Sequence, residues 1–383
     1  MSKKVGLLLP RSAIYPTMSF DLMGGLKWAL ESCGITDVEI KTEGIGIAAD
    51  GKLIYTMCEK LIFDGCEIVA GYVNPVTAEQ LKPLFEGANA LFIALDGGYQ
   101  YPASLTAMPN VITLSFQGTL CCRIAGATAV AEGCRNMAFT GSFYDAGFRG
   151  IHALARGLED AGGAITFNHI TKLKRSEFTL EPLAQHLKEH ATDGVLAAFC
   201  GDMLQDFFAG ASAENLFENH AVYGSPFVGD EVWLAQSAYP GVDIKTFVTW
   251  ASGLDNTANL QFKQKMAEKK LRYNIFSVLG WEAGQITAAA LGAEDIDDRI
   301  RILEGLKYTS PRGEVVIDAA THNCDAPVYE AWIKRDEATG NCILIPVKES
   351  PLSDDQRQKL YEDIRNFAGP ATSWQNAYGC LDD

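Results

Sequence analysis

This sequence lacks the marks of a nucleic-acid-binding or membrane-spanning protein. No Lys/Arg cluster exceeds the short run from Lys172 to Arg175, in a chain of 383 residues with net charge −16. That acidity disfavours nucleic acid and anionic membranes as partners, and the run is expected to be a solvated surface stretch. No apolar run approaches the roughly 18 residues of a membrane span, so no membrane insertion is expected.

Metal-binding and redox spacings of cysteine are missing too. Ten cysteines are scattered along the chain, and none forms C-x-x-C, so we expect no metal. Many lone cysteines favour a reducing compartment. Cys324 and Cys342 flank a predicted hairpin and could pair, but buried free thiols are the favoured interpretation.

Phosphate-binding and hydrolase motifs are absent as well. Neither G-x-G-x-x-G nor G-x-x-x-x-G-K-[ST] follows a predicted strand, so no cofactor is expected. There is no G-x-S-x-G elbow. Cys200 ends a strand and could be a nucleophile, but no histidine partner can be placed beside it. We therefore predict no catalytic residues and keep an α/β hydrolase-like enzyme as the alternative of another class.

What the chain does contain is two successive series of short apolar runs alternating with amphipathic helical patterns. The first series spans the strand 5–9 to the strand 111–114, and the second spans the helix 119–133 to the strand 246–250. Strand–helix–strand units with short links are typical of parallel sheets covered on both faces. Two such series predict an α/β fold with two doubly wound parallel-sheet lobes.

The last third begins no third series, so we expect it to complete the earlier sheets. Its predicted elements are helices over 259–269, 275–291 and 298–306, a strand over 313–318, a hairpin of 328–334 with 342–347, and a helix around 354–367.

Aromatic and polar side chains gather directly after the predicted strands. Ligands of open α/β sheets bind at the carboxyl ends of the strands, and aromatic walls with a few polar anchors suit a small organic solute. Helix N-terminal amides near Thr77 and Gly147 could hold a carboxylate, and Asp202 or Asp230 could hold an amine or hydroxyl. The candidate ligand-binding residues are Ser12, Tyr15, Tyr72, Asn74, Val76, Thr77, Asp96, Gly97, Tyr99, Tyr144, Phe148, Cys200, Asp202, Phe227, Asp230 and Trp250.

Each of these residues also has an ordinary structural alternative. A strand-end tyrosine is often a packing residue, and an aspartate before a helix is often only its N-cap. The collective pattern therefore carries the prediction, more than any one member.

Four segments, in their order and spacing, resemble the type I periplasmic binding proteins, specifically the branched-chain amino-acid branch of the ABC-transporter solute receptors. The resemblance runs from about Val5 to Val347. The segments are the opening strand 5–10 with its helix, 139–147 continuing to 158–163, 250–262 followed by 281–291, and 306–318 with His322 and 327–329.

The resemblance implies three hinge strands, with crossings near 115–118, 250–255 and 324–326. Lobe 1 is then expected to comprise residues 1–117 plus 252–324, and lobe 2 residues 118–251 plus 325–383. It further implies that the lobes close on a small solute without transforming it, so the chain is not expected to be an enzyme.

The family pattern also bears on the solute. Amino-acid-binding members offer a Ser/Thr-rich loop to the carboxylate, and the matching loop 74–77 is poorer in hydroxyls. The residue expected to meet the amine corresponds most nearly to Asp230. With the tyrosines after the strands, this favours a small polar or aromatic solute, such as an amino acid or another carboxylate.

The implied function is that of a solute-binding protein in an ABC-type uptake system, with a membrane permease as partner. A cytoplasmic ligand sensor on the same fold is the alternative, and it would need a protein partner. Because Lys4 passes directly into an apolar strand, we expect either a periplasmic protein whose export signal has been removed or a cytoplasmic protein.

Overall fold

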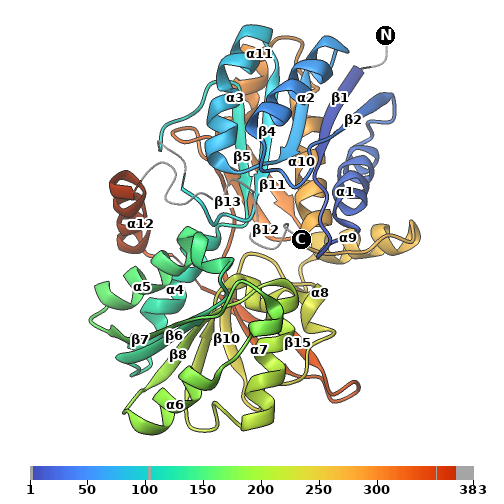
Figure 1. Cartoon of the computed structure of the whole chain (residues 1–383). Coiled ribbons are helices and arrows are strands. Elements are labelled where there is room, and N and C mark those ends of the chain that lie inside the picture. Colours follow the sequence, from blue (N-terminus) through green and yellow to red (C-terminus); the bar gives the residue numbers. More distant parts are fainter. Residues whose placement is uncertain (1–2, 102–104, 351, 368–383) are drawn as a thin grey trace. The chain divides into compact units, whose positions relative to one another are not determined.

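The computed structural model describes residues 3–101, 105–350 and 352–367 (Figure 1). The chain divides into two compact units: unit 1 comprises residues 1–116, 254–327 and 364 onward, and unit 2 comprises residues 117–253 and 328–363. It changes unit after Phe116, Gly253, Pro327 and Asp363, whereas the sequence predicted changes after residues 117, 251 and 324. The predicted lobe 2 also included residues 364–367, which group with unit 1.

Unit 1 is built on a five-stranded parallel sheet with the order β2-β1-β3-β4-β5. Its core joins α2 (Gly51–Phe63) and α3 (Pro75–Ala88) to the sheet through buried side chains such as Leu61, Val69, Phe85 and Phe92. Strands β3 and β4 are buried along their whole length, which explains their continuous apolar sequences. The strands are β1 Lys3–Leu9, β2 Val38–Gly44, β3 Ile68–Tyr72, β4 Leu91–Asp96 and β5 Val111–Ser115.

Two helices of unit 1 that lie far apart in the sequence approach each other closely through glycines. A Cβ atom on Gly280 of α10 would lie 2.1 Å from Leu22 O of α1, and one on Gly25 of α1 would lie 2.2 Å from Ser277 O. Only glycine allows this backbone contact, which fixes α10 against α1. The helices of unit 1 are α1 Met18–Ser32, α2 Gly51–Phe63, α3 Pro75–Ala88, α9 Thr257–Glu268, α10 Ile275–Ala290 and α11 Ile296–Leu303.

A small antiparallel sheet of β11 Lys307–Ser310, β12 Gly313–Ile317 and β13 Cys324–Asp325 completes unit 1. A parallel bridge between Thr113 and Asn323 attaches it beside β5. The predicted helix 298–306 was too long: Glu304 already has an extended backbone, Gly305 follows with a φ of +75°, and β11, which the sequence did not predict, begins at Lys307.

Unit 2 contains a seven-stranded sheet with the order β15-β14-β10-β9-β8-β6-β7. The five strands from β6 to β10 are parallel, whereas β14 pairs antiparallel with β10 and β15 antiparallel with β14. The predicted hairpin is confirmed, and it extends an otherwise parallel sheet. The strands are β6 Asn136–Gly141, β7 Ala164–Ile170, β8 Gly194–Ala198, β9 Ala221–Gly224, β10 Ile244–Val248, β14 Tyr329–Arg335 and β15 Cys342–Glu349.

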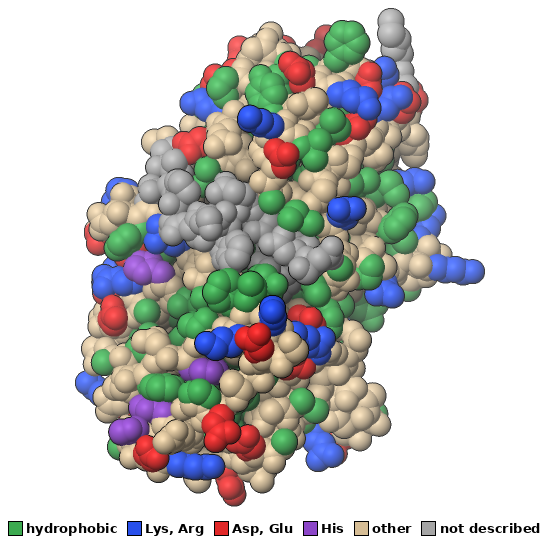
Figure 2. Space-filling view, in the orientation of Figure 1, with side chains coloured by type: hydrophobic (Ala, Val, Ile, Leu, Met, Phe, Trp, Pro, Cys, Tyr) green, Lys and Arg blue, Asp and Glu red, His purple; other side chains and the backbone are tan. Residues whose placement is uncertain are grey.

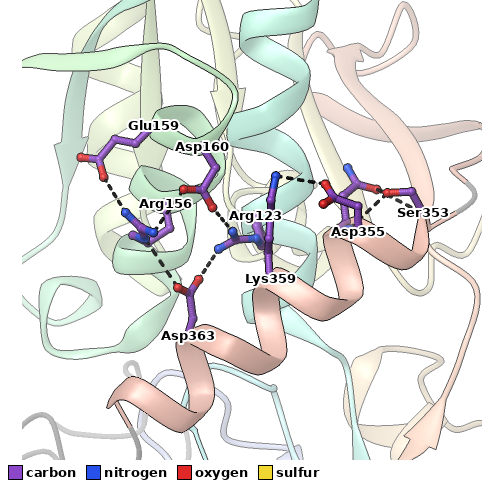
Figure 3. Close-up of polar contacts among 9 residues, drawn as sticks. Arg123, Arg156, Glu159, Asp160, Ser353, Asp355, Lys359 and Asp363 are labelled. Atoms are coloured by element: carbon purple, nitrogen blue, oxygen red, sulfur yellow. Dashed lines mark hydrogen bonds and ion pairs between the residues drawn. The ribbon is translucent and has the colours of Figure 1, made fainter.

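The last described helix is fixed to unit 2 by a charge cluster around the buried side chains of Arg123 and Asp363 (Figure 3). Asp363 of α12 pairs with Arg123 of α4, and its other carboxylate oxygen lies 3.5 Å from Arg156 Nε of α5. Asp160 pairs with the same two arginines. The helices of unit 2 are α4 Gly118–Ala131, α5 Arg149–Asp160, α6 Glu181–Glu189, α7 Gly201–Glu214, α8 Glu231–Leu234 and α12 Asp354–Phe367, whose last residues from Ile364 group with unit 1.

Acidic and basic side chains are interspersed over the face shown in Figure 2. Within the described ranges, no helix is long and apolar enough to cross a membrane.

Candidate functional site

The strand ends of unit 1 gather an aromatic cluster around a residue that the sequence did not single out. The ring of Phe276, from the first turn of α10, lies 5.0 Å from the ring of Tyr15 and 5.9 Å from that of Tyr72, both in edge-to-face geometry. Tyr15 follows β1 and Tyr72 ends β3, so two of the strand-end tyrosines contact the same ring within this unit. All three side chains are buried.

The start of α10 is built to hold Phe276 in place. Asn274 is the N-cap, and its Oδ1 accepts from the Phe276 and Ser277 amides at 3.0 Å each. Its Nδ2 donates to Asp21 Oδ2 of α1 at 2.7 Å. Burial of the Asp21 carboxyl raises its pKa, although the hydrogen bonds from Asn274 and Thr17 oppose that effect. The signal in the sequence was an N-cap asparagine before an apolar helix.

Two polar candidates of unit 1, Ser12 and Asn74, accept hydrogen bonds from nearby backbone amides. Ser12 Oγ accepts from the amides of Ile14 and Tyr15 at 3.1 and 3.0 Å. Asn74 caps α3, because its Oδ1 accepts from the Thr77 amide at 2.8 Å. The Thr77 amide itself is therefore already engaged within the helix start. Val76, next to Asn74 and Pro75, is half-buried at the same helix start.

Asp96 ends β4 as a buried carboxyl, and Gly97 and Tyr99 beside it are buried too. Its Oδ1 accepts from the Gly98 amide at 2.9 Å. Burial raises its pKa to about 7, and hydrogen bonds from Ser115 and Gly98 limit the shift. The Asp96 carboxyl can therefore change its charge near neutral pH.

A second buried carboxyl, that of Asp145, follows β6 in unit 2. The sequence analysis did not select this residue. Asp145 Oδ2 accepts from Ser142 Oγ at 2.6 Å, and Ser142 Oγ accepts from the Asp145 amide at 3.0 Å. Burial raises the pKa of Asp145 to about 7, whereas the hydrogen bonds from Ser142 and the Cys200 backbone lower it. Asp145 thereby ties the end of β6 to the end of β8.

The helix start expected at Gly147 is displaced. Asp145–Gly147 forms a short 3-10 turn, α5 begins at Arg149, and the Gly147 amide donates to Tyr144 O at 3.0 Å. That amide is thus engaged within the turn. Tyr144 is half-buried and Phe148 is buried.

The other candidates of unit 2 are divided between capping, pairing and burial. Asp230 caps the short helix α8, with its Oδ1 accepting from the Val232 amide at 3.0 Å. Asp202 lies 3.3 Å from Arg175 in a partly exposed ion pair. Cys200 is buried and disulfide-bonded. Phe227 and Trp250 are buried after β9 and β10.

The other residues considered for chemistry are buried cysteines and possible metal ligands. Cys324 and Cys342 are both free and buried, as favoured from the sequence. Burial raises the pKa of Cys66 to about 11 and that of Cys58 to about 12, so neither thiol is activated. No group of three or more metal-ligating side chains occurs among the described residues. What the strand ends offer is ring surface together with a few hydroxyl, amide and carboxyl groups.

Ring surface with a few polar groups is typical of sites that bind small solutes. The family model of the periplasmic binding proteins matches residues 2–338, so the chain belongs to the periplasmic binding protein family. Family membership confirms the predicted resemblance, fold class and solute-binding class. One relative is the Leu/Ile/Val-binding protein homolog 6 of Brucella suis biovar 1 (strain 1330), 20% identical over 350 residues that cover 88% of this chain and 89% of that protein.

Solved structures share the fold. A solute binding protein of an ABC transporter from Rhodopseudomonas palustris BisB5, in complex with 3,4-dihydroxy benzoic acid, is 20% identical with a TM-score of 0.74 and covers 93% of this chain and 99% of its own. Another from R. palustris, in complex with benzoate, is 24% identical with a TM-score of 0.74 and the same coverage. An ABC transporter substrate-binding protein from Sphaerobacter thermophilus reaches a TM-score of 0.78 at 19% identity, covering 91% of this chain and 98% of its own.

Proposed function

We propose that this chain is the solute receptor of an ABC-type uptake system and that its solute is a small carboxylate bearing an aromatic ring. The observation that carries the proposal is the cluster of Tyr15 and Tyr72 around Phe276 at the strand ends of unit 1. Edge-to-face rings form a firm wall for a planar guest. Benzoate and 3,4-dihydroxybenzoate in two structures of the same fold support the choice of solute.

We assign the remaining contacts to the strand ends of both units. In unit 1 these are Ser12, Asn74, Val76, Thr77, Asp96, Gly97 and Tyr99, and in unit 2 they are Tyr144, Phe148, Cys200, Asp202, Phe227, Asp230 and Trp250. The buried carboxyls Asp96 and Asp145, with pKa values raised to about 7, can donate a hydrogen bond to a solute carboxylate while protonated. The solute is released unchanged, because this role requires no nucleophile.

The proposed role includes a location and a partner. The receptor works in the periplasm and delivers its solute to a membrane permease. A cytoplasmic sensor on the same fold would bind the same solute without a permease, and finding the protein in an osmotic-shock fraction of its host decides between the two.

An aliphatic amino acid is the second candidate, favoured by the Brucella relative. A thermal-shift panel of benzoate, 4-hydroxybenzoate, 3,4-dihydroxybenzoate and leucine separates the candidates, because a ligand raises the melting temperature of the state that binds it. The aromatic acids are expected to raise the melting temperature and leucine to leave it unchanged. A shift with leucine alone overturns the aromatic assignment, and chemical conversion of any hit overturns the receptor role.

A further inference from the structure

Strand β2 forms an open edge of the unit 1 sheet, where it pairs with β1 on one side (Figure 1). The Ile45 amide just after β2 donates to Leu9 O of β1 at 3.1 Å. Because the backbone groups of successive strand residues point to opposite sides, those of Ile40 and Thr42 point away from β1. In the described part of the chain, neither residue has a hydrogen-bond partner on that outer side.

An apolar groove runs beside this open edge. It has a volume of about 380 Å³ and lies between α1 and β2. Thr42 and Gly44 are exposed and Ile40 is half-buried, so a second strand can reach the edge. An open edge next to an apolar groove is a docking place for a further strand. The groove is lined by Met23, Lys27, Leu30, Glu31, Ile35, Thr36, Val38 and Ile40.

The charges of β2 specify which strand fits. Glu39 and Lys41 lie on the opposite face from Ile40 and form an ion pair at 2.5 Å, with side chains 46% and 37% exposed. In an antiparallel pair of two such strands centred on Ile40, Glu39 of each copy faces Lys41 of the other. If one strand slides by two residues along the other, Lys41 lies opposite Lys41, or Glu39 lies opposite Glu39. Opposite charges directly across an antiparallel pair stabilise it and like charges destabilise it.

A lysine in an edge strand usually discourages pairing with other strands. Here Lys41 faces a carboxylate, Glu39 of the second copy, only in the register centred on Ile40. The lysine therefore disfavours pairing with most other strands but not with a second β2. A two-fold axis through Ile40, perpendicular to the sheet, also brings both α1–β2 grooves to the same face. Val38 and Ile40 of both copies then shield one another from water.

We propose that β2 is a dimerisation strand, through which two copies of this chain pair antiparallel about Ile40. The pairing joins two five-stranded sheets into one continuous sheet, and the Glu39–Lys41 contacts fix its register.

Charge variants test the proposal in solution. Light scattering or analytical ultracentrifugation of the full chain at physiological ionic strength should show a species of twice the 41.6 kDa chain mass. Lys41→Glu and Glu39→Lys are each expected to weaken association at least tenfold, and the double swap Glu39→Lys/Lys41→Glu is expected to restore it. Lys307→Glu changes an exposed ion pair across β11 and β12 and serves as the matched control. A monomer at every concentration, or a double swap that stays as weak as the single variants, overturns the proposal.

Cysteine cross-linking tests the register. Hydrogen-bonded antiparallel pairs have Cα atoms about 5.5 Å apart, within disulfide range. In a Cys33→Ser background, which removes the exposed thiol of Cys33, Ile40→Cys should form a disulfide-linked dimer on mild oxidation. Thr42→Cys should not, because Thr42 faces Val38 of the second copy. Equal cross-linking at both positions, or none at Ile40→Cys, contradicts the assigned pairing.

Discussion

Arg312 and Glu282 form a fully buried, doubly hydrogen-bonded ion pair in unit 1. Arg312 Nε lies 2.7 Å from Glu282 Oε1, and Nη2 lies 2.5 Å from Oε2. The third guanidinium nitrogen, Nη1, donates to Ser115 O at 2.8 Å, at the end of β5. Since Phe116 is the last residue before the chain enters unit 2, this pair holds the strand that leads to the first crossing.

Removing one partner of this pair should be costly. Arg312→Leu leaves the Glu282 carboxylate buried without its cation, so the free energy of unfolding should fall by about 3–5 kcal/mol. Denaturant unfolding measures this. The matched control is Arg301→Leu, which breaks an exposed pair with Asp298 and should cost less than about 1 kcal/mol. Equal losses in both variants would show that burial of the pair does not matter.

The charge cluster of unit 2 should decide how firmly α12 is attached. Asp363→Ala removes the carboxylate that Arg123 and Arg156 share, so hydrogen exchange across residues 354–367 should accelerate by at least tenfold while β8 stays protected. Asp355→Ala, which breaks an exposed pair with Lys359 on the same helix, should change exchange little. Unchanged exchange in Asp363→Ala would mean that apolar contacts alone hold the helix.

Two glycine-to-alanine substitutions should change the free energy of unfolding in opposite directions. Gly280→Ala places a methyl group 2.1 Å from Leu22 O, so α10 must move away from α1, and we expect a loss of about 1–3 kcal/mol. Gly87→Ala near the end of α3 meets nothing within 4 Å and should gain up to about 1 kcal/mol from helix propensity. Thermal unfolding of the two variants checks both signs. A neutral Gly280→Ala would contradict the close helix contact.

Stability should depend on pH through the buried carboxyl of Asp145. Its pKa is about 7 in the folded chain, against an ordinary value of 3.8, so the folded chain keeps a proton that the unfolded chain loses between those pH values. The free energy of unfolding therefore falls as the pH rises from about 4 to 7. Asp145→Asn removes this dependence, so its stability relative to the wild type should improve from pH 5 to pH 8. Asp355→Asn, an exposed control, should show no such trend, and a flat difference for Asp145→Asn would refute the assignment.

Much of the fold could be predicted from periodicity. The alternation of apolar runs with amphipathic patterns placed β1 to β10, and the turn at Asp336–Gly340 placed the hairpin β14–β15. Short elements without a periodic pattern were missed, namely β11 and α8. Their structure depends on neighbours distant in the sequence, such as β12 for β11.

The site was harder to predict, because its members meet through tertiary contacts. The residues after each strand could be selected by rule, yet Phe276 lies far from Tyr15 and Tyr72 in the sequence. The N-cap Asn274 indicates the start of its helix, but not that Phe276 contacts the two tyrosines. In the loop after β6, the sequence analysis selected the aromatic residues Tyr144 and Phe148 and did not select Asp145. The capping roles of Asn74 and Asp230 follow from local spacing, but spacing alone does not say whether a cap also binds a ligand.

Titration calorimetry with 4-hydroxybenzoate tests the central proposal, that the chain binds one aromatic carboxylate through residues at its strand ends. Val76→Asp puts a negative charge at the start of α3, where the helix dipole tolerates it but a solute carboxylate is repelled. Val76→Asn is its neutral control, and Tyr144→Ala removes a ring from unit 2. We predict one saturable site per chain in the wild type, at least tenfold weaker binding in Val76→Asp and in Tyr144→Ala, and a smaller change in Val76→Asn. Undiminished affinity in both Val76→Asp and Tyr144→Ala, or no binding by the wild type, would contradict the account.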